Sequence, residues 1–97
     1  MRLGGFELCP DGRSLRITTP AGRSEAATEP FLRGTNHLLV MGLDLEGEAE
    51  LEGGLVFRAA GDRVILSLGG HSETFPKSAV ERCFLELAAR SMPGTDP

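Results

Sequence analysis

The feature that most constrains the fold is the Asp11-Gly12 dipeptide, which lies between two runs of alternating apolar and polar residues. Asp-Gly is a strong signal for a two-residue β-hairpin loop, because both central residues of a type I′ turn need positive φ angles. A turn there aligns the apolar residues of both runs on one face of the hairpin. The predicted pairs are Leu8 with Leu15 and Phe6 with Ile17.

A second hairpin is predicted over residues 55–68, with its turn at Gly61-Asp62. The predicted pairs are Ala59 with Val64, Phe57 with Leu66 and Leu55 with Leu68. A three-residue loop, Glu52-Gly53-Gly54, is predicted to join this hairpin to the strand before it. That loop sets Leu51 opposite Leu55 and Ala49 opposite Phe57, whereas a two-residue loop would turn Leu51 to the wrong face.

Residues 38–52 alternate between apolar and polar positions, which is typical of a half-buried strand. The apolar face consists of Leu39, Met41, Leu43, Leu45, Ala49 and Leu51. The other face consists of Asp44, Glu46, Glu48, Glu50 and Glu52, which we call the acidic row. In the predicted register Glu48 lies opposite Arg58 and forms a cross-strand ion pair with it.

The C-terminal region predicts one amphipathic helix over residues 78–91, with Ser78 and Glu81 as a capping box. Its apolar stripe consists of Val80, Cys83, Phe84, Leu87 and Ala88. Residues 20–36 predict a long loop, because proline and glycine recur through them. Residues 92–97 predict a disordered tail, and no internal repeat is evident.

These segments predict a single α+β domain over residues 1–97. We expect a twisted antiparallel sheet of four or five strands, arranged as hairpins in a meander, with the one C-terminal helix packed on one face. The chain has 97 residues and an ordinary apolar content of 40%, which fits one domain of modest core.

The formal net charge of −4 is concentrated in residues 37–54, which hold five acidic residues and no basic one. A low pI near 5.1 and the lack of a basic stripe disfavour nucleic-acid binding. No segment has the composition of a signal peptide or of a membrane span, so we expect a cytoplasmic protein that does not bind membranes. The two cysteines, Cys9 and Cys83, fit a reducing compartment.

The acidic row is the leading candidate site, with Arg58 beside it. It is suited to docking a basic protein surface or to imitating a row of phosphates, although a solvated strand face that discourages aggregation is the simpler interpretation. A straight row does not converge on one point, which disfavours a calcium or magnesium site. His37, His71, Cys9 and Cys83 lack the close spacing of zinc ligands, so we expect no metal and no cofactor.

The function that these features favour is a non-enzymatic protein-binding or accessory module of bacterial type, such as an inhibitor, immunity or adaptor protein. One alternative is a homodimer whose interface uses Val56, Ile65 or Leu85. The other is a small ligand-binding or enzymatic domain around residues 69–73, with His71 and Ser72 beside the loop over residues 20–36.

Overall fold

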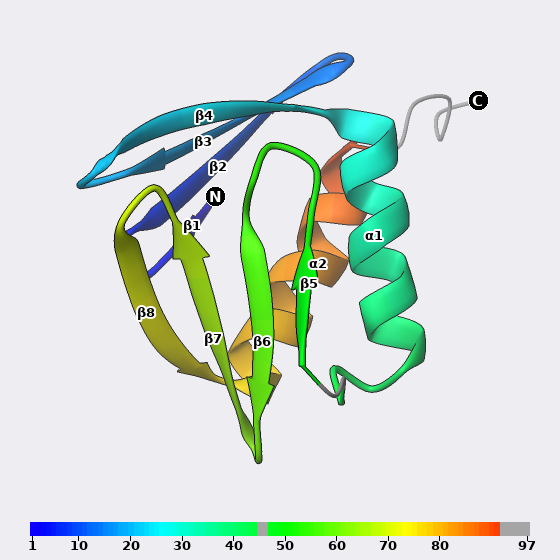
Figure 1. Ribbon diagram of the computed structural model, residues 1–97. Coiled ribbons are helices and arrows are strands. Elements are labelled where there is room, and N and C mark those ends of the chain that lie inside the picture. The colour runs from blue at the N-terminus through cyan, green and yellow to red at the C-terminus, as the bar shows by residue number, and fades with distance from the viewer. Residues whose placement is uncertain (45–46, 92–97) are drawn as a thin grey trace.

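The computed structural model describes residues 1–44 and 47–91. Two antiparallel sheets of four strands are each followed by one helix, so the fold is α+β (Figure 1). The first unit consists of β1 (Arg2–Leu3), β2 (Phe6–Asp11), β3 (Ser14–Thr19), β4 (Gly22–Ala27) and α1 (Thr28–Val40). The second consists of β5 (Glu48–Glu50), β6 (Val56–Ala60), β7 (Arg63–Leu68), β8 (His71–Pro76) and α2 (Lys77–Ser91). Both sheets are meanders, since neighbouring strands follow one another along the chain.

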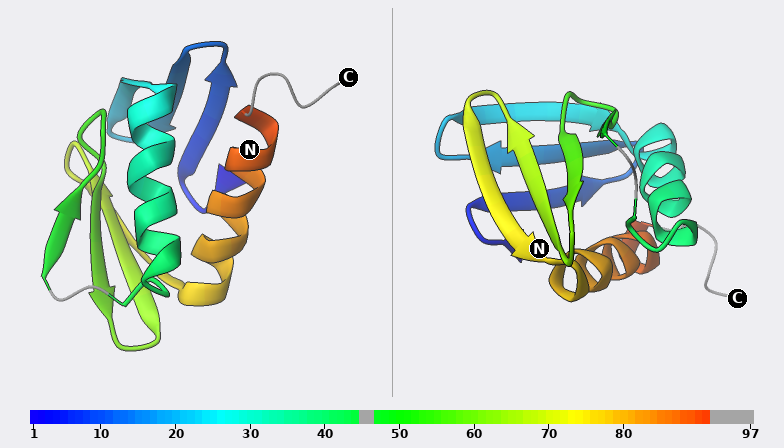
Figure 2. Two further views of the ribbon diagram at one scale, coloured as in Figure 1. Left: turned by 90° about the vertical axis from the view of Figure 1, so that its right-hand side faces the viewer. Right: turned by 60° about the horizontal axis from the view of Figure 1, so that its bottom comes forward.

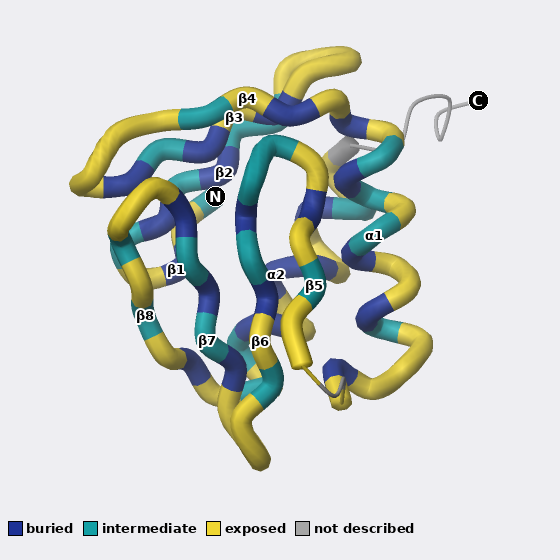
Figure 3. The backbone as a smooth tube through the Cα atoms, in the orientation of Figure 1, coloured by how far each residue is buried: buried dark blue, intermediate teal, exposed yellow. Residues whose placement is uncertain are grey.

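The apolar core draws on both sheets and on both helices, which run along one side of the molecule (Figure 2). One phenylalanine from each of these four parts is fully buried, namely Phe6 of β2, Phe31 of α1, Phe57 of β6 and Phe84 of α2. Buried and more exposed residues alternate along the central strands (Figure 3). Within the described residues, neither helix has the length and apolar character needed to cross a membrane.

The hairpin predictions are confirmed in part. In the second unit Ala59 pairs with Val64 and Phe57 with Leu66, as predicted, and Ala49 pairs with Phe57 across the three-residue loop. In the first hairpin the register differs by two residues, because the turn residues are Gly12-Arg13 and Leu8 pairs with Ile17. Gly12 has φ +65° and takes the first central position of the turn. A shift of two residues keeps the same side chains on the buried face.

The two units form an internal repeat, so the expectation of no repeat is wrong. Three pairs of equivalent elements begin 49 residues apart. They are β3 and β7 (Ser14 and Arg63), β4 and β8 (Gly22 and His71), and α1 and α2 (Thr28 and Lys77). Few equivalent positions are identical: Gly4, Gly5, Gly12, Arg33 and Leu38 correspond to Gly53, Gly54, Gly61, Arg82 and Leu87. The repeat is carried by turn glycines and by buried positions more than by residue identity.

The loop predicted over residues 20–36 is also wrong, because β4 and most of α1 occupy it, and residues 1–44 and 47–91 form two helices instead of one. β4 pairs with β3 along its whole length despite weak strand-forming residues. Pro30 lies in the first turn of α1, where a backbone N–H has no helical partner in any case. Gly34 lets α1 pack closely on the second unit, since a Cβ there would lie 2.7 Å from Leu51 Cδ2.

The strand predicted over residues 38–52 is wrong as well. Residues 38–40 end α1, and the strand β5 is only three residues long. The helix ends in a Schellman motif, in which the Gly42 N–H donates to Leu39 O at 3.0 Å and the Leu43 N–H donates to Leu38 O at 2.9 Å. Gly42 has φ +70°, and the buried Leu43 side chain completes the motif. The alternating pattern therefore combines a helix end with a short strand.

The C-terminal helix is confirmed, although it begins at Lys77, one residue before the predicted start. Ser78 is therefore inside the helix and is not its N-cap, so the predicted capping box is wrong. The Lys77 N–H instead donates to Asp62 O in the turn between β6 and β7, at 3.1 Å. The Thr28 N–H of α1 donates in the same way to Arg13 O, at 2.8 Å. The predicted tail at residues 92–97 lies outside the described residues.

Candidate functional site

The face of the β5–β8 sheet that points away from the core is the candidate site, and we call it the outer face. Strand pairing arranges its side chains in two rows. One row is Glu50, Val56, Ser67 and Ser72, and the other is Glu48, Arg58, Ile65 and Thr74. The acidic edge is therefore followed by a centre containing Val56 and Ile65, both half-buried, and then by hydroxyl groups on β8.

The structure divides the predicted acidic row. Only Glu48 and Glu50 lie side by side on β5, where both are exposed. Asp44 follows the end of α1, and its carboxylate lies 3.8 Å from Lys77 Nζ. Glu52 is exposed in the turn before β6, and Glu46 lies outside the described residues. The prediction of five carboxylates along one strand fails because α1 extends into the segment that carries the alternating pattern.

The register that places Glu48 opposite Arg58 is confirmed, but the two side chains form no ion pair. Among the described residues, no ion pair involves Glu48 or Glu50 either. Both carboxylates are exposed and repel each other weakly across one strand pleat. A cation from outside the chain would relieve that repulsion.

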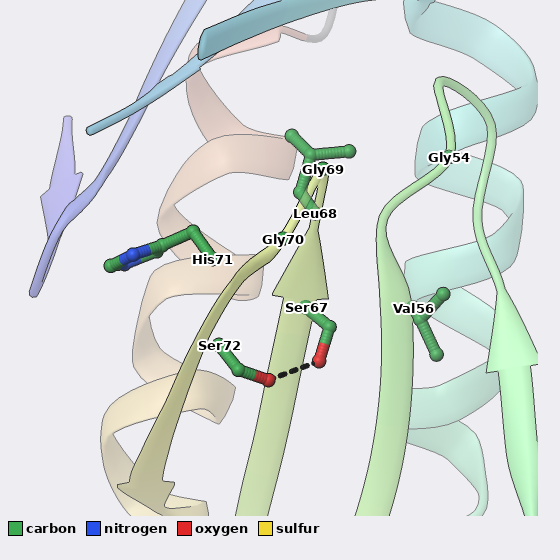
Figure 4. A pocket seen from close by; sticks show the side chains of 8 residues that line it. All are labelled: Gly54, Val56, Ser67, Leu68, Gly69, Gly70, His71 and Ser72. Atoms are coloured by element: carbon green, nitrogen blue, oxygen red, sulfur yellow. Dashed lines mark hydrogen bonds between the residues drawn. The ribbon is translucent and has the colours of Figure 1, made fainter. Parts of the chain in front are cut away.

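A shallow hollow of about 290 Å³ lies at the end of the outer face, between Gly54 and the Gly69-Gly70 turn (Figure 4). Val56, Ser67, His71 and Ser72 are among the residues that line it, and the two serine hydroxyls are hydrogen-bonded to each other (Figure 4). Val56 also pairs with Glu50 across the sheet, so the hollow and the acidic edge are adjacent. No charged side chain from β6 or β7 enters its lining.

His71 and Ser72 both belong to the lining of the hollow, but their side chains lie on opposite sides of β8. Successive residues of a strand point to opposite faces, and the His71 ring points away from the Ser67–Ser72 pair (Figure 4). His71 Nε2 lies 2.5 Å from Glu73 Oε2, which also accepts a hydrogen bond from the Gly5 N–H at 2.6 Å. The ring stacks edge-on against Phe6, with centroids 5.2 Å apart. This cluster joins the first unit to the second, a role that the sequence does not signal.

The cysteines do not form a reactive or metal-binding centre. Cys83 is buried on α2, and burial raises the pKa of its thiol to about 11, with the nearby Glu86 adding to the shift. At neutral pH this thiol is protonated and therefore a poor nucleophile. Cys9 lies on β2 and is half-buried. Within the part of the chain that the structure describes, no three His, Cys, Asp or Glu residues are grouped to hold a metal ion.

The Glu73 carboxylate makes stability depend on pH. The hydrogen bond with His71 holds the pKa of Glu73 below its usual 4.5, with help from the Gly5 N–H and against the effect of burial. A carboxyl group with a lowered pKa stabilises the fold above its unfolded pKa, and this stabilisation is lost as the pH falls through its folded pKa.

We therefore expect Glu73→Gln to lower the denaturation midpoint at pH 7. The difference in midpoint between variant and wild type should become smaller as the pH falls below about 4.5, the usual pKa of this group. Urea melts between pH 3 and pH 7 measure this difference. The exposed Glu81→Gln variant is the control and should give a curve parallel to that of the wild type. A Glu73→Gln curve that runs parallel to the wild type at every pH would contradict the prediction.

The chain matches no family model, and neither curated proteins nor solved structures give a match.

Proposed function

We propose that this protein is a non-enzymatic binding module that docks a basic protein partner on the outer face of the β5–β8 sheet. The observation that carries the proposal is the arrangement of that face, with two carboxylates that form no ion pair among the described residues beside an apolar centre and a shallow hollow. Interfaces commonly combine an apolar centre with a charged rim that selects the partner.

The internal repeat supplies a comparison within the same chain. On the β1–β4 sheet, the positions equivalent to Val56, Ser67 and Ser72 are Glu7, Thr18 and Arg23. These side chains are larger or charged, and Glu7 pairs with Arg2 at 3.7 Å. The two sheets share a backbone plan, yet the second places Glu48 and Glu50, which form no ion pair among the described residues, beside the apolar Val56 and Ile65. This difference supports the outer face of the second sheet as the docking surface.

The test is capture of the partner by the immobilised full-length protein. We expect Glu48→Lys with Glu50→Lys to reduce capture at least about tenfold, because like charges then face the basic partner. Capture by the wild type should also weaken as salt is raised. Glu25→Lys with Glu81→Lys is the matched control, since it makes the same charge change at two exposed sites elsewhere.

The partner is the protein that the wild type and the control retain and the Glu48/Glu50 variant loses, as identified by mass spectrometry. Equal capture by all three proteins would eliminate the outer face as the contact surface. Circular dichroism of each variant checks that the fold is intact.

Self-association through the same face is a second candidate, because Val56 and Ile65 place apolar surface at its centre. Val56→Asp with Ile65→Asp would then convert a dimer into a monomer by light scattering. Leu85, the third residue suggested for this role, is 55% exposed on α2.

A further inference from the structure

The two units contact each other through matching residues, and we call these contacts the seam. The Gly4-Gly5 turn of the first unit packs on β8, and the equivalent Gly53-Gly54 turn of the second unit packs on β4. The Gly5 N–H donates to Glu73 at 2.6 Å, and Ser24 Oγ donates to Gly53 O at 2.6 Å. Glu73 of β8 and Ser24 of β4 occupy equivalent positions in the two units. Each hydrogen bond therefore joins this position of one unit to the Gly-Gly turn of the other unit.

The same turns also pack closely on the equivalent strands, β4 and β8. A Cβ at Gly53 would lie 2.9 Å from Ala26 Cβ, and a Cβ at Gly4 would lie 2.6 Å from Phe75 Cε1. Ala26 and Phe75 are equivalent residues of β4 and β8, and both are buried. In a two-fold dimer, a residue of one subunit contacts a second residue of the other subunit, and the same contact occurs again with the subunits interchanged. The contacts between the two units of this chain have the same arrangement. Here one chain carries both halves of that interface.

We infer that a second copy of this chain can occupy the seam by exchange of units, giving a dimer in which the first unit of each copy packs on the second unit of the other. Every seam contact is then kept, and only the connection between the units changes. The competition between monomer and exchanged dimer therefore depends on the connection and on protein concentration.

The connection after α1 contains a strained residue. Leu43 has φ +58° and is the only described non-glycine residue with a positive φ. Residues with a Cβ disfavour this conformation, and strained hinges favour exchange between copies. A rotation at Gly42 and Leu43 would relieve the strain and direct the second unit away from the first.

The test refolds the full-length protein from denaturant at low and at high concentration, followed by light scattering. We expect a dimer whose fraction rises several-fold with concentration during refolding, and which persists after dilution because release requires the seam to open. Co-refolding two differently tagged forms should give mixed dimers, whereas mixing them after folding should give none.

Two variants separate this dimer from other forms of association. Inserting Gly-Ser-Gly-Ser between Gly47 and Glu48 lengthens the connection and should lower the dimer fraction several-fold. Val56→Asp with Ile65→Asp changes only the outer face and should leave the fraction unchanged. A chain that refolds as a monomer at every concentration, or a dimer that dissociates at once on dilution and is lost in the Val56/Ile65 variant, would overturn the inference. If the insertion prevents folding, the dilution and mixing experiments still decide the question.

Discussion

Phe57→Ala is expected to destabilise the protein by about 3–5 kcal/mol, because it leaves a cavity where the core cannot close fully. Phe57 is 0% exposed and is the second residue of β6, paired with Ala49 on one side and Leu66 on the other. The chain has five phenylalanines and neither tryptophan nor tyrosine, so few other large side chains can fill the space. A domain of this size has a total stability of roughly 5–15 kcal/mol, of which this loss is a large part.

The free energy of unfolding from urea melts measures the effect of Phe57→Ala, and the melting temperature should fall by more than about 10 °C. Val56→Ala is the control, because Val56 neighbours Phe57 but faces the other side of the sheet. Its cost should be about 1 kcal/mol or less. Similar losses for the two variants would mean that the buried face of β6 has been assigned incorrectly.

Gly53→Ala is expected to destabilise the protein by roughly 2–4 kcal/mol, from the cost of a positive φ angle together with overpacking. Gly53 has φ +89°, and a Cβ there would lie 2.9 Å from Ala26 Cβ and 3.3 Å from Glu25 O. Neither neighbour can move aside easily, because both belong to β4. The same shift would disturb the hydrogen bond from Ser24 to Gly53 O.

Gly61→Ala is the matched control for Gly53→Ala. Gly61 has φ +67°, but a Cβ there meets no atom within 4 Å. Gly61→Ala should therefore destabilise the protein only by the cost of placing alanine at a positive φ angle, about 1–2 kcal/mol. Chemical denaturation of both variants separates the backbone cost from the cost of opening the seam. Equal losses in the free energy of unfolding at the two positions would show that the seam accommodates a Cβ at Gly53 without destabilising the protein.

Much of the fold follows from local signals. The glycine-containing turns and the alternating apolar residues predict the β2–β3 and β6–β7 hairpins, and the three-residue loop places Ala49 opposite Phe57 as observed. The 3.6-residue spacing of Val80, Cys83, Phe84 and Leu87 predicts the face that α2 buries. These features need only neighbouring residues, and so they can be predicted from short stretches of sequence.

The prediction of the candidate site was less accurate, because it depended on a long-range choice between helix and strand. Residues 38–43 alternate as a strand does, yet they complete α1 and its Schellman motif. Glu48 and Glu50 remain together, whereas Asp44 and Glu52 lie on separate turns. The hollow beside them depends on the alignment of three strands, which no single segment reveals.

The sequence by itself determined the Gly61-Asp62 turn, the buried faces of two hairpins and the amphipathic C-terminal helix, because local backbone preferences and the period of apolar residues decide them. Only the tertiary structure decided that residues 20–40 form β4 and α1, since their proline, glycine and weak strand-forming residues are stabilised by pairing with β3 and by packing on Leu51. It also decided the repeat and its seam, because Gly4-Gly5 and Gly53-Gly54 acquire their role only when each turn meets a strand of the other unit.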